Sequence, residues 1–275
     1  MEPSPLSELV FCKLGGSIIT DKQRPSTPRS EVIERLAHEV AAALDARPEL
    51  RLLLGHGSGS FGHVVAEKHA VHRGIADDQS WWGFAETSAV AGQLNRIVTD
   101  TFIRAGVPVV SIQPSASARC KGGELVALDE HAICEALRHG LVPLVYGDVA
   151  FDDEQGCTII STEAEFAYLA HRLRPARIVL IGEVDGVYDG DPQTDRAASR
   201  IPRVTLDTFA QIEDRLGGSH GVDVTGGMLA KVRDMVHLVA QGDTLRVHLF
   251  SGLLEGALTR VLLGTDSQVG TIIQA

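Results

Sequence analysis

Short apolar runs alternate with longer amphipathic stretches along the whole chain. The short runs have the length of strands, and the longer stretches carry apolar residues at helical spacing. The predicted strands are Leu9–Leu14, Leu50–Leu54, Val107–Ile112, Leu141–Tyr146, Ala176–Ile181, Leu245–Phe250 and Gly270–Ile273. The predicted helices are Arg29–Ala46, Trp81–Arg104, Asp129–His139, Thr162–Leu173 and Gly226–Ala240. This alternation predicts right-handed βαβ units and an α/β three-layer sandwich with a mainly parallel central sheet.

Composition supports the same fold class and narrows the function. Aromatic residues make up only 5% of the 275 residues, so the core must rest on aliphatic side chains, which is typical of strands buried on both faces. The formal charge is -11, and no run of Lys and Arg occurs. An acidic surface repels a phosphate backbone, so nucleic-acid binding is not expected. A site for an anionic ligand must therefore be built from a few placed lysines and backbone N–H groups.

Cysteine spacing and hydropathy predict the compartment. The four cysteines lie far apart without paired spacing, which indicates reduced, buried thiols and neither a disulfide framework nor a zinc site. The polar N-terminus does not resemble a secretory signal, and no apolar run approaches the roughly 18–20 residues of a membrane span. We therefore expect a cytoplasmic protein without a membrane partner. Residues 183–203 are polar and turn-rich, and we expect a hairpin or surface excursion there.

The first predicted strand ends in a lysine and a leucine, and two glycines follow it. Gly15 and Gly16 allow backbone N–H groups to approach an anion closely, and Lys13 adds a positive charge. Ser17 could add a hydroxyl contact, and Lys22 follows within reach of the same strand end. This segment is either a phosphate site or a turn that only ends the strand.

The second predicted strand runs into a longer glycine-rich segment, Gly55–His63. Four glycines in eight residues lead into a stretch expected to be helical from Val64 to Ala70, a pattern that favours a phosphate-binding loop. It matches neither the P-loop nor the dinucleotide-binding fingerprint. His63 at the helix entrance could donate to a phosphate oxygen, although a histidine taken alone is more often structural.

Two later segments add charged groups at comparable places. Asp148 follows the most apolar predicted strand, where a carboxylate can orient lysines, although a turn aspartate is the simpler alternative. Further on, Thr225, Gly226 and Gly227 open an amphipathic helix, and Lys231 lies about one turn inside it. Amides and a lysine suit a nucleotide phosphate; the alternative is a capped helix with a solvated lysine.

Together these segments resemble the amino acid kinase family, and within it the isopentenyl phosphate kinases. The resemblance rests on Lys13–Lys22, Gly59–His63, the Gly-Asp pair at Gly147, and Asp223–Met228, and it covers almost the whole chain. It implies phosphoryl transfer from ATP to isopentenyl phosphate, with Mg²⁺ bridging the donor phosphates and a homodimer as the assembly. It also implies a single domain, 1–275, with an acceptor-binding lobe at about 1–150 and a nucleotide-binding lobe at about 151–275.

The resemblance also implies roles for individual residues. Lys13, Lys22 and Lys231 would contact the donor phosphates, with Lys22 nearest the transferred group. His63 would hold the acceptor phosphate, and Asp148 would be an orienting carboxylate. The remaining nucleotide-binding positions would be Gly15, Gly16, Ser17, Ser58, Asp185 and Gly227. The remaining acceptor-binding positions would be Gly57, Gly59 and Gly147.

One segment departs from the family pattern, and other functions stay open. Where many relatives have a Ser-Gly-Asp turn, this chain has Ser161, Thr162 and Glu163, so the glutamate would have to replace the missing aspartate. The five-carbon tail of the acceptor needs an apolar pocket, for which the candidates are Ile75, Trp81, Trp82 and Phe84. The alternatives are a fosfomycin-type phosphonate kinase, another small-molecule kinase of the same fold, and a non-catalytic nucleotide- or anion-binding protein.

Overall fold

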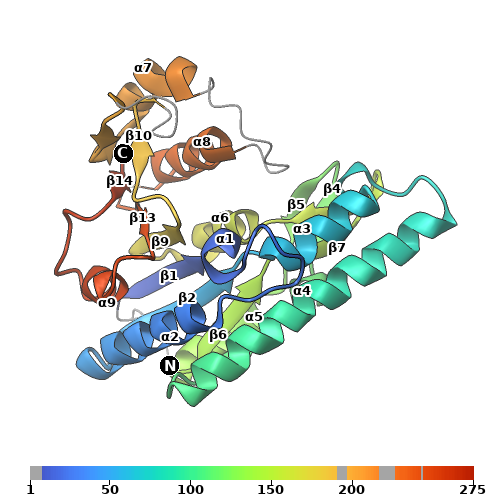
Figure 1. Ribbon diagram of the computed structural model, residues 1–275, viewed down its shortest axis with the longest axis horizontal. Coiled ribbons are helices and arrows are strands. Elements are labelled where there is room, and N and C mark those ends of the chain that lie inside the picture. The colour runs from blue at the N-terminus through green and yellow to red at the C-terminus, as the bar shows by residue number, and fades with distance from the viewer. Residues whose placement is uncertain (1–7, 191–196, 217–226, 243) are drawn as a thin grey trace.

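A mainly parallel eight-stranded sheet forms the centre of the protein (Figure 1). The computed structural model describes residues 8–190, 197–216, 227–242 and 244–275. Every neighbouring pair in the large sheet is parallel except β13–β14. In spatial order the strands are β12 (Arg203–Val204), β14 (Thr271–Ile273), β13 (Arg246–Ser251), β9 (Arg177–Gly182), β1 (Leu9–Leu14), β2 (Arg51–His56), β6 (Val142–Tyr146) and β3 (Val109–Ser111). Each of the seven predicted strands is present, with ends shifted by at most two residues.

Helices cover both faces of this sheet and give the predicted three layers. Alternate residues of β1 enter two separate cores: Leu9 and Phe11 join one, and Val10 and Cys12 join the other. Residues of α2, α4 and α9 complete the second core, whereas α5, α6 and α8 complete the first. The helices are α1 (Gly16–Ile19), α2 (Ser30–Ala46), α3 (Gly59–Lys68), α4 (Asp78–Arg104), α5 (His131–Arg138), α6 (Thr162–Leu173), α7 (Leu206–Leu216), α8 (Gly227–Ala240) and α9 (Ala257–Leu262).

Two helices begin earlier than the sequence pattern predicts. Helix α4 begins at Asp78 and not at Trp81, because Asp77 and Ser80 form a reciprocal capping box in which Asp77 Oδ1 accepts from Ser80 N at 2.9 Å. Helix α3 begins at Gly59 and not at Val64. Its first turn is rich in glycine, which disfavours a helix locally, so tertiary contacts must hold this turn in place.

A second sheet of four strands was not predicted from the sequence. It contains β5 (Glu124–Ala127), β4 (Arg119–Lys121), β7 (Asp148–Asp152) and β8 (Gly156–Ile160), in that order. Its strands are short, and its turns depend on Asp152, whose carboxylate accepts backbone N–H groups from Gly122, Gly123, Glu154 and Gln155 at 2.7–3.0 Å. Figure 1 shows this small sheet beside α3 and one end of the long helix α4.

The polar segment 183–203 contains the expected hairpin. Strands β10 (Val187–Tyr188) and β11 (Arg200–Ile201) pair antiparallel, while residues 191–196 lie outside the described residues. No helix in the described part of the chain combines the length and apolar character needed to cross a membrane.

Candidate active site

Loops from four neighbouring strands meet at one edge of the large sheet. Backbone hydrogen bonds join them directly: Gly15 N donates to Ile181 O at 2.7 Å, Gly57 N donates to Leu14 O at 3.0 Å, and Gly147 N donates to the carbonyl that precedes Gly57 at 3.0 Å. These contacts link the carboxyl ends of β9, β1, β2 and β6. In open α/β sheets this edge is the usual ligand site.

The two glycine loops pack against each other backbone to backbone. A Cβ added at Gly16 would lie 2.5 Å from the backbone nitrogen of Gly59, closer than real Cβ atoms approach. A Cβ at Gly59, which has φ +51°, would lie 2.2 Å from the hydroxyl oxygen of Thr20. The Thr20 hydroxyl in turn accepts from Ser60 N at 3.0 Å and holds the first turn of α3. Glycine is therefore required at both positions, and the backbone nitrogens of Gly16 and Gly59 each lie close to the facing loop.

Lys13 lies at this edge, at the end of β1, and forms an ion pair with Glu163. Both residues are buried, with 8% and 9% exposure. Glu163 stands in the first turn of α6, whose N-cap Ser161 accepts from Ala164 N at 3.1 Å. Burial raises the pKa of the Glu163 carboxyl, but the positive charges of Lys13 and Lys231 outweigh it, so the pKa is lowered overall. The glutamate thus stands beside Lys13 as an ionised partner.

Asp148, the predicted orienting carboxylate, is the first residue of β7. Its carboxylate accepts from Val149 N at 2.8 Å and from Ser115 N at 3.4 Å. Hydrogen bonds from the hydroxyls of Ser115 and Ser88 lower its pKa. Burial raises the pKa of Asp148 despite these hydrogen bonds. The ion pair with Lys13 is made by Glu163, and Asp148 lies on the side of the site formed by α4 and the segment after β3.

Lys22 lies on the loop after α1, and its side chain is 68% exposed. Its Nζ lies 3.9 Å from a carboxylate oxygen of Glu183, which follows β9 and also binds the Arg29 guanidinium at 2.8 Å. Sequence reasoning missed Glu183 and Arg29. Asp185, two residues after Glu183, is exposed and accepts from the Tyr188 hydroxyl at 2.8 Å. Lys22 therefore lies on the solvent-exposed side of the site, whereas Lys13 is buried.

The glycine-rich segment Gly55–His63 contains two histidines with opposite environments. His63 is exposed on α3, inside the helix and not at its entrance, because the helix begins at Gly59. His56 is fully buried, its ring is stacked on Tyr146, and its Nε2 accepts from the Asn95 amide at 3.2 Å. Its Nδ1 donates to Gly57 O at 3.0 Å.

Burial lowers the pKa of His56 to about 4, so the ring is neutral at pH 7. With Nε2 accepting and Nδ1 donating, one tautomer is fixed, and the ring holds the backbone of the glycine loop. Sequence reasoning passed over His56 because nothing in a Gly-His-Gly segment distinguishes a buried histidine from a binding one.

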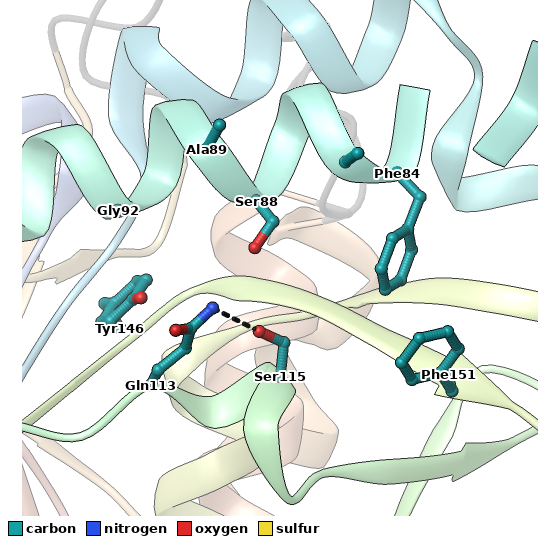
Figure 2. Close-up of a pocket in the computed structure, with 9 residues that line it drawn as sticks. Phe84, Ser88, Ala89, Gly92, Gln113, Ser115, Tyr146 and Phe151 are labelled. Carbon is teal, nitrogen blue, oxygen red and sulfur yellow. Dashed lines mark hydrogen bonds between the residues drawn. The ribbon is translucent and has the colours of Figure 1, made fainter. Parts of the chain in front are cut away.

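A pocket of about 520 Å³ opens beside Asp148 (Figure 2). Phe84 and Phe151 form one end, with ring centroids 4.9 Å apart, and Tyr146 stands at the other end (Figure 2). The wall from α4 carries small side chains, and Ser88 points inward toward Gln113 and Ser115 in the same view. The lining residues are Phe84, Ala85, Ser88, Ala89, Gly92, Gln113, Ser115, Tyr146 and Phe151.

Of the four apolar residues expected to form a tail pocket, one lines this pocket. Phe84 does so, and Trp81 packs on Phe84 and Phe151 at centroid distances of 5.9 and 6.1 Å without lining it. Trp82 is 65% exposed, and Ile75 packs near Val71 and Cys157 away from the lining. Tyr146 joins this pocket to the glycine loop, because its ring stacks on His56 and Gly147 follows it directly.

Part of the predicted nucleotide segment lies outside the described residues. These are residues 217–226, which include Asp223, Thr225 and Gly226. Gly227 is the first residue of α8, and Lys231 lies on that helix near enough to Glu163 to lower its pKa. Within the described ranges, no group of three or more His, Cys, Asp or Glu side chains could hold a metal ion.

Comparison with known proteins identifies the family. The family model described as the amino acid kinase family matches residues 8–251. The chain belongs to the amino acid kinase family.

Related members share most of its length. The isopentenyl phosphate kinase of Methanothermobacter thermautotrophicus is 33% identical over 94% of this chain and 96% of its own. That of Methanocaldococcus jannaschii is 35% identical over 93% and 95%. A crystal structure described as that of an isopentenyl phosphate kinase superposes with a TM-score of 0.83 at 30% identity, covering 97% of this chain and all of the other. The predicted fold class, an amino acid kinase fold, is confirmed.

Proposed function

We propose that this protein is an ATP-dependent kinase that phosphorylates isopentenyl phosphate to isopentenyl diphosphate, a step of isoprenoid biosynthesis. The observation that carries the proposal is the joining of two subsites by one strand end. Tyr146 lines the pocket, and Gly147 N donates to the His56 carbonyl at the end of β2, the strand whose Gly55 pairs with Lys13. A phosphate monoester with a short apolar tail matches this pair of subsites. The isopentenyl phosphate kinases that are 33% and 35% identical to the chain support the same acceptor.

The phosphate groups of ATP would lie over the two glycine loops. The space between Gly16 and Gly59 is too narrow for a side chain, so backbone N–H groups can face the ligand without obstruction. Lys13 and Lys231 would hold the donor phosphates from the buried side, and Lys22 would reach the transferred group from the open side. Asp185 would contact the nucleoside, and Gly227 would add an amide from the start of α8.

Magnesium fits this arrangement only as a partner of the nucleotide. The described residues provide no carboxylate cage, so Mg²⁺ would be held chiefly by the donor phosphates. When bound, it would supply charge neutralisation between those phosphates.

The acceptor would enter with its tail between the wall of α4 and the two phenylalanines. Its phosphate would lie beside Gly57, Gly59 and Gly147, with His63 donating from α3. A phosphate oxygen of the acceptor then bonds to the γ-phosphorus of ATP, the bond from that phosphorus to the β,γ-bridging oxygen breaks, and ADP leaves. Because the acceptor oxygen is already ionised, no general base is needed, and positioning with charge stabilisation supplies the catalysis.

The test is ADP release by purified protein with Mg-ATP and a panel of acceptors: isopentenyl phosphate, dimethylallyl phosphate, fosfomycin, glutamate and UMP. We expect isopentenyl phosphate to exceed the non-prenyl acceptors by orders of magnitude in kcat/KM. Turnover of fosfomycin alone would contradict isopentenyl phosphate as the acceptor but would still support a kinase. No acceptor-dependent ADP release from a folded preparation would overturn the catalytic proposal. A homodimer and a cytoplasmic location remain predictions.

A further inference from the structure

Glu165 occupies a position where the helix pattern calls for an apolar residue. In α6, the buried face that packs toward the large sheet carries Thr162, Phe166 and Leu169, and Glu165 shares this face. Its relative exposure is 0%, equal to that of Phe166 and Leu169. A glutamate is almost never fully buried without a partner. The position therefore retains a carboxyl group where a leucine would pack more favourably.

The Glu165 carboxyl has no hydrogen-bond partner. Neither Oε1 nor Oε2 meets a donor or acceptor among the residues that the structure describes. An ionised carboxylate in such an environment is very costly, and the group responds by holding its proton. Burial accordingly raises the pKa of Glu165 well above its usual range.

Four titratable groups face Glu165 from the elements around it. Asp148 from β7 and Glu163 from its own helix oppose its ionisation, and Lys13 from β1 favours it. Tyr146 from β6 is affected in turn, because Glu165 helps to raise the pKa of its hydroxyl. Burial and the two carboxyl groups thus raise the pKa of Glu165 by more than Lys13 lowers it.

The three carboxyl groups of this cluster are not equivalent. Glu163 is paired with Lys13, and Asp148 accepts from two backbone N–H groups. Within the described part of the chain, only Glu165 among the three has no donor. A further buried negative charge here would oppose the phosphate groups that the site has to bind.

We propose that Glu165 is a positioning residue that remains a neutral carboxylic acid beneath the active site and so keeps the charge of Lys13 available to the phosphates. This rests on the proposed function for its consequence, though not for the state of the carboxyl group itself. Loss of the proton would add a second negative charge near Lys13, beyond that of Glu163, compete with the donor phosphates and weaken their binding.

The state of the carboxyl group can be tested without an activity assay. Infrared difference spectroscopy separates the carbonyl stretch of a protonated carboxyl from that of a carboxylate. We expect a protonated-carboxyl band at pH 7 that disappears in Glu165→Gln and persists in Glu34→Gln, a control on the exposed face of α2. Absence of the band from the wild-type protein would overturn the proposal.

Stability gives a second readout that is independent of catalysis. The unfolded glutamate loses its proton near its usual pKa of about 4.3, whereas the folded one holds it to higher pH. The folded state therefore binds more protons above that value, and wild-type stability falls as pH rises. We expect Glu165→Gln to remove this fall and to raise Tm at pH 7.5 by about 2 °C or more. A Tm difference that is the same at pH 4 and pH 7.5 would contradict a neutral acid.

The effect of the Glu165 proton on nucleotide binding can be tested by measuring the KM for ATP at several pH values. Over the range in which the infrared band disappears, we expect the wild-type KM for ATP to rise about tenfold, as a unit charge near a lysine would cause, and Glu165→Gln to lack this rise. Loss of the band without a change in KM would remove the positioning role. Failure of every acceptor to turn over would instead leave the band and the Tm readouts intact, so it would count against the proposed function only.

Discussion

Lys13 and Glu163 form a buried ion pair that joins the end of β1 to the first turn of α6. The lysine is thereby held in one direction while the start of α6 is fixed against the sheet. Since an unpaired buried charge is strongly unfavourable, each partner depends on the other for its place. We propose that the glutamate replaces the aspartate of the family's Ser-Gly-Asp turn, with a side chain longer by one methylene.

Removing this partner should impair catalysis more than binding. In Glu163→Gln the amide cannot balance the Lys13 charge, and we expect kcat to fall about 100-fold, as for the loss of a preorganised electrostatic contact. Glu163→Asp should retain more activity than Glu163→Gln because it keeps the charge. The check is steady-state kinetics on both variants, together with a melting curve to show that each is folded. Equal losses in the two variants would mean that the charge is not what matters.

Lys22 is expected to act on the transferred phosphoryl group. We predict that Lys22→Ala lowers kcat by about 100-fold while the KM for isopentenyl phosphate changes little, because the contact would form mainly in the transition state. The matched control is Lys121→Ala, since Lys121 is 60% exposed against 68% for Lys22 and pairs with Glu154 on the small sheet. Near-normal turnover of the Lys22 variant would refute the assignment.

His63 should contribute to acceptor binding specifically. Its loss in His63→Ala is expected to raise the KM for isopentenyl phosphate by about tenfold, as removal of a charge-assisted hydrogen bond would, and to leave the KM for ATP nearly unchanged. His38→Ala, at an exposed position of α2, provides the control. Equal increases in both KM values would show that His63 does not distinguish the two substrates.

The pKa of His56 predicts a loss of stability in acid. The folded pKa of about 4 lies below the usual 6.5, so the unfolded state binds more protons between these values. The histidine's contribution is complete above pH 6.5 and is lost as pH falls toward 4, in total roughly 3 kcal/mol at most. Denaturant unfolding at several pH values should show that His56→Gln, although less stable at pH 7, loses less stability over this interval. Parallel pH profiles would contradict a neutral His56.

Filling the pocket should affect the acceptor and spare the nucleotide. Ala89→Phe places a ring in the cavity between Phe84 and Tyr146 and is expected to lower kcat/KM for isopentenyl phosphate at least tenfold, with the KM for ATP maintained. Gln93→Phe puts the same ring on the exposed face of α4 and should have little effect. An unaffected Ala89→Phe enzyme would place the acceptor tail elsewhere.

The sequence predicts the large sheet and its helices because each is long enough to show a clear period. The small sheet escapes prediction because Arg119–Lys121 and Glu124–Ala127 are too short to show a period, and because the Asp152 carboxylate that organises its turns resembles any other turn aspartate. Such strands are stabilised by tertiary contacts that no local pattern records.

The candidate site is only partly predictable for a related reason. Lys13 and the glycine loops stand out in the sequence because unusual residues are adjacent in the chain. The partners of these residues are not adjacent: Glu163 follows Lys13 by 150 positions, and Arg29 meets a carboxylate 154 positions away. Glu165 gives no signal at all, since a glutamate in a helix is expected to be solvated until the fold shows that its face is buried.

The alternation of β1 between two cores restricts how this chain can change in length. A deletion of one residue within Leu9–Leu14 would turn every later side chain of the strand to the opposite layer, exchanging Phe11 for Cys12 and directing Lys13 away from Glu163. The turn between Lys121 and Glu124 is exposed, and a change of length there would leave the alternation of β1 intact. Sequence length in this lineage should therefore drift at the small sheet and remain constant along β1.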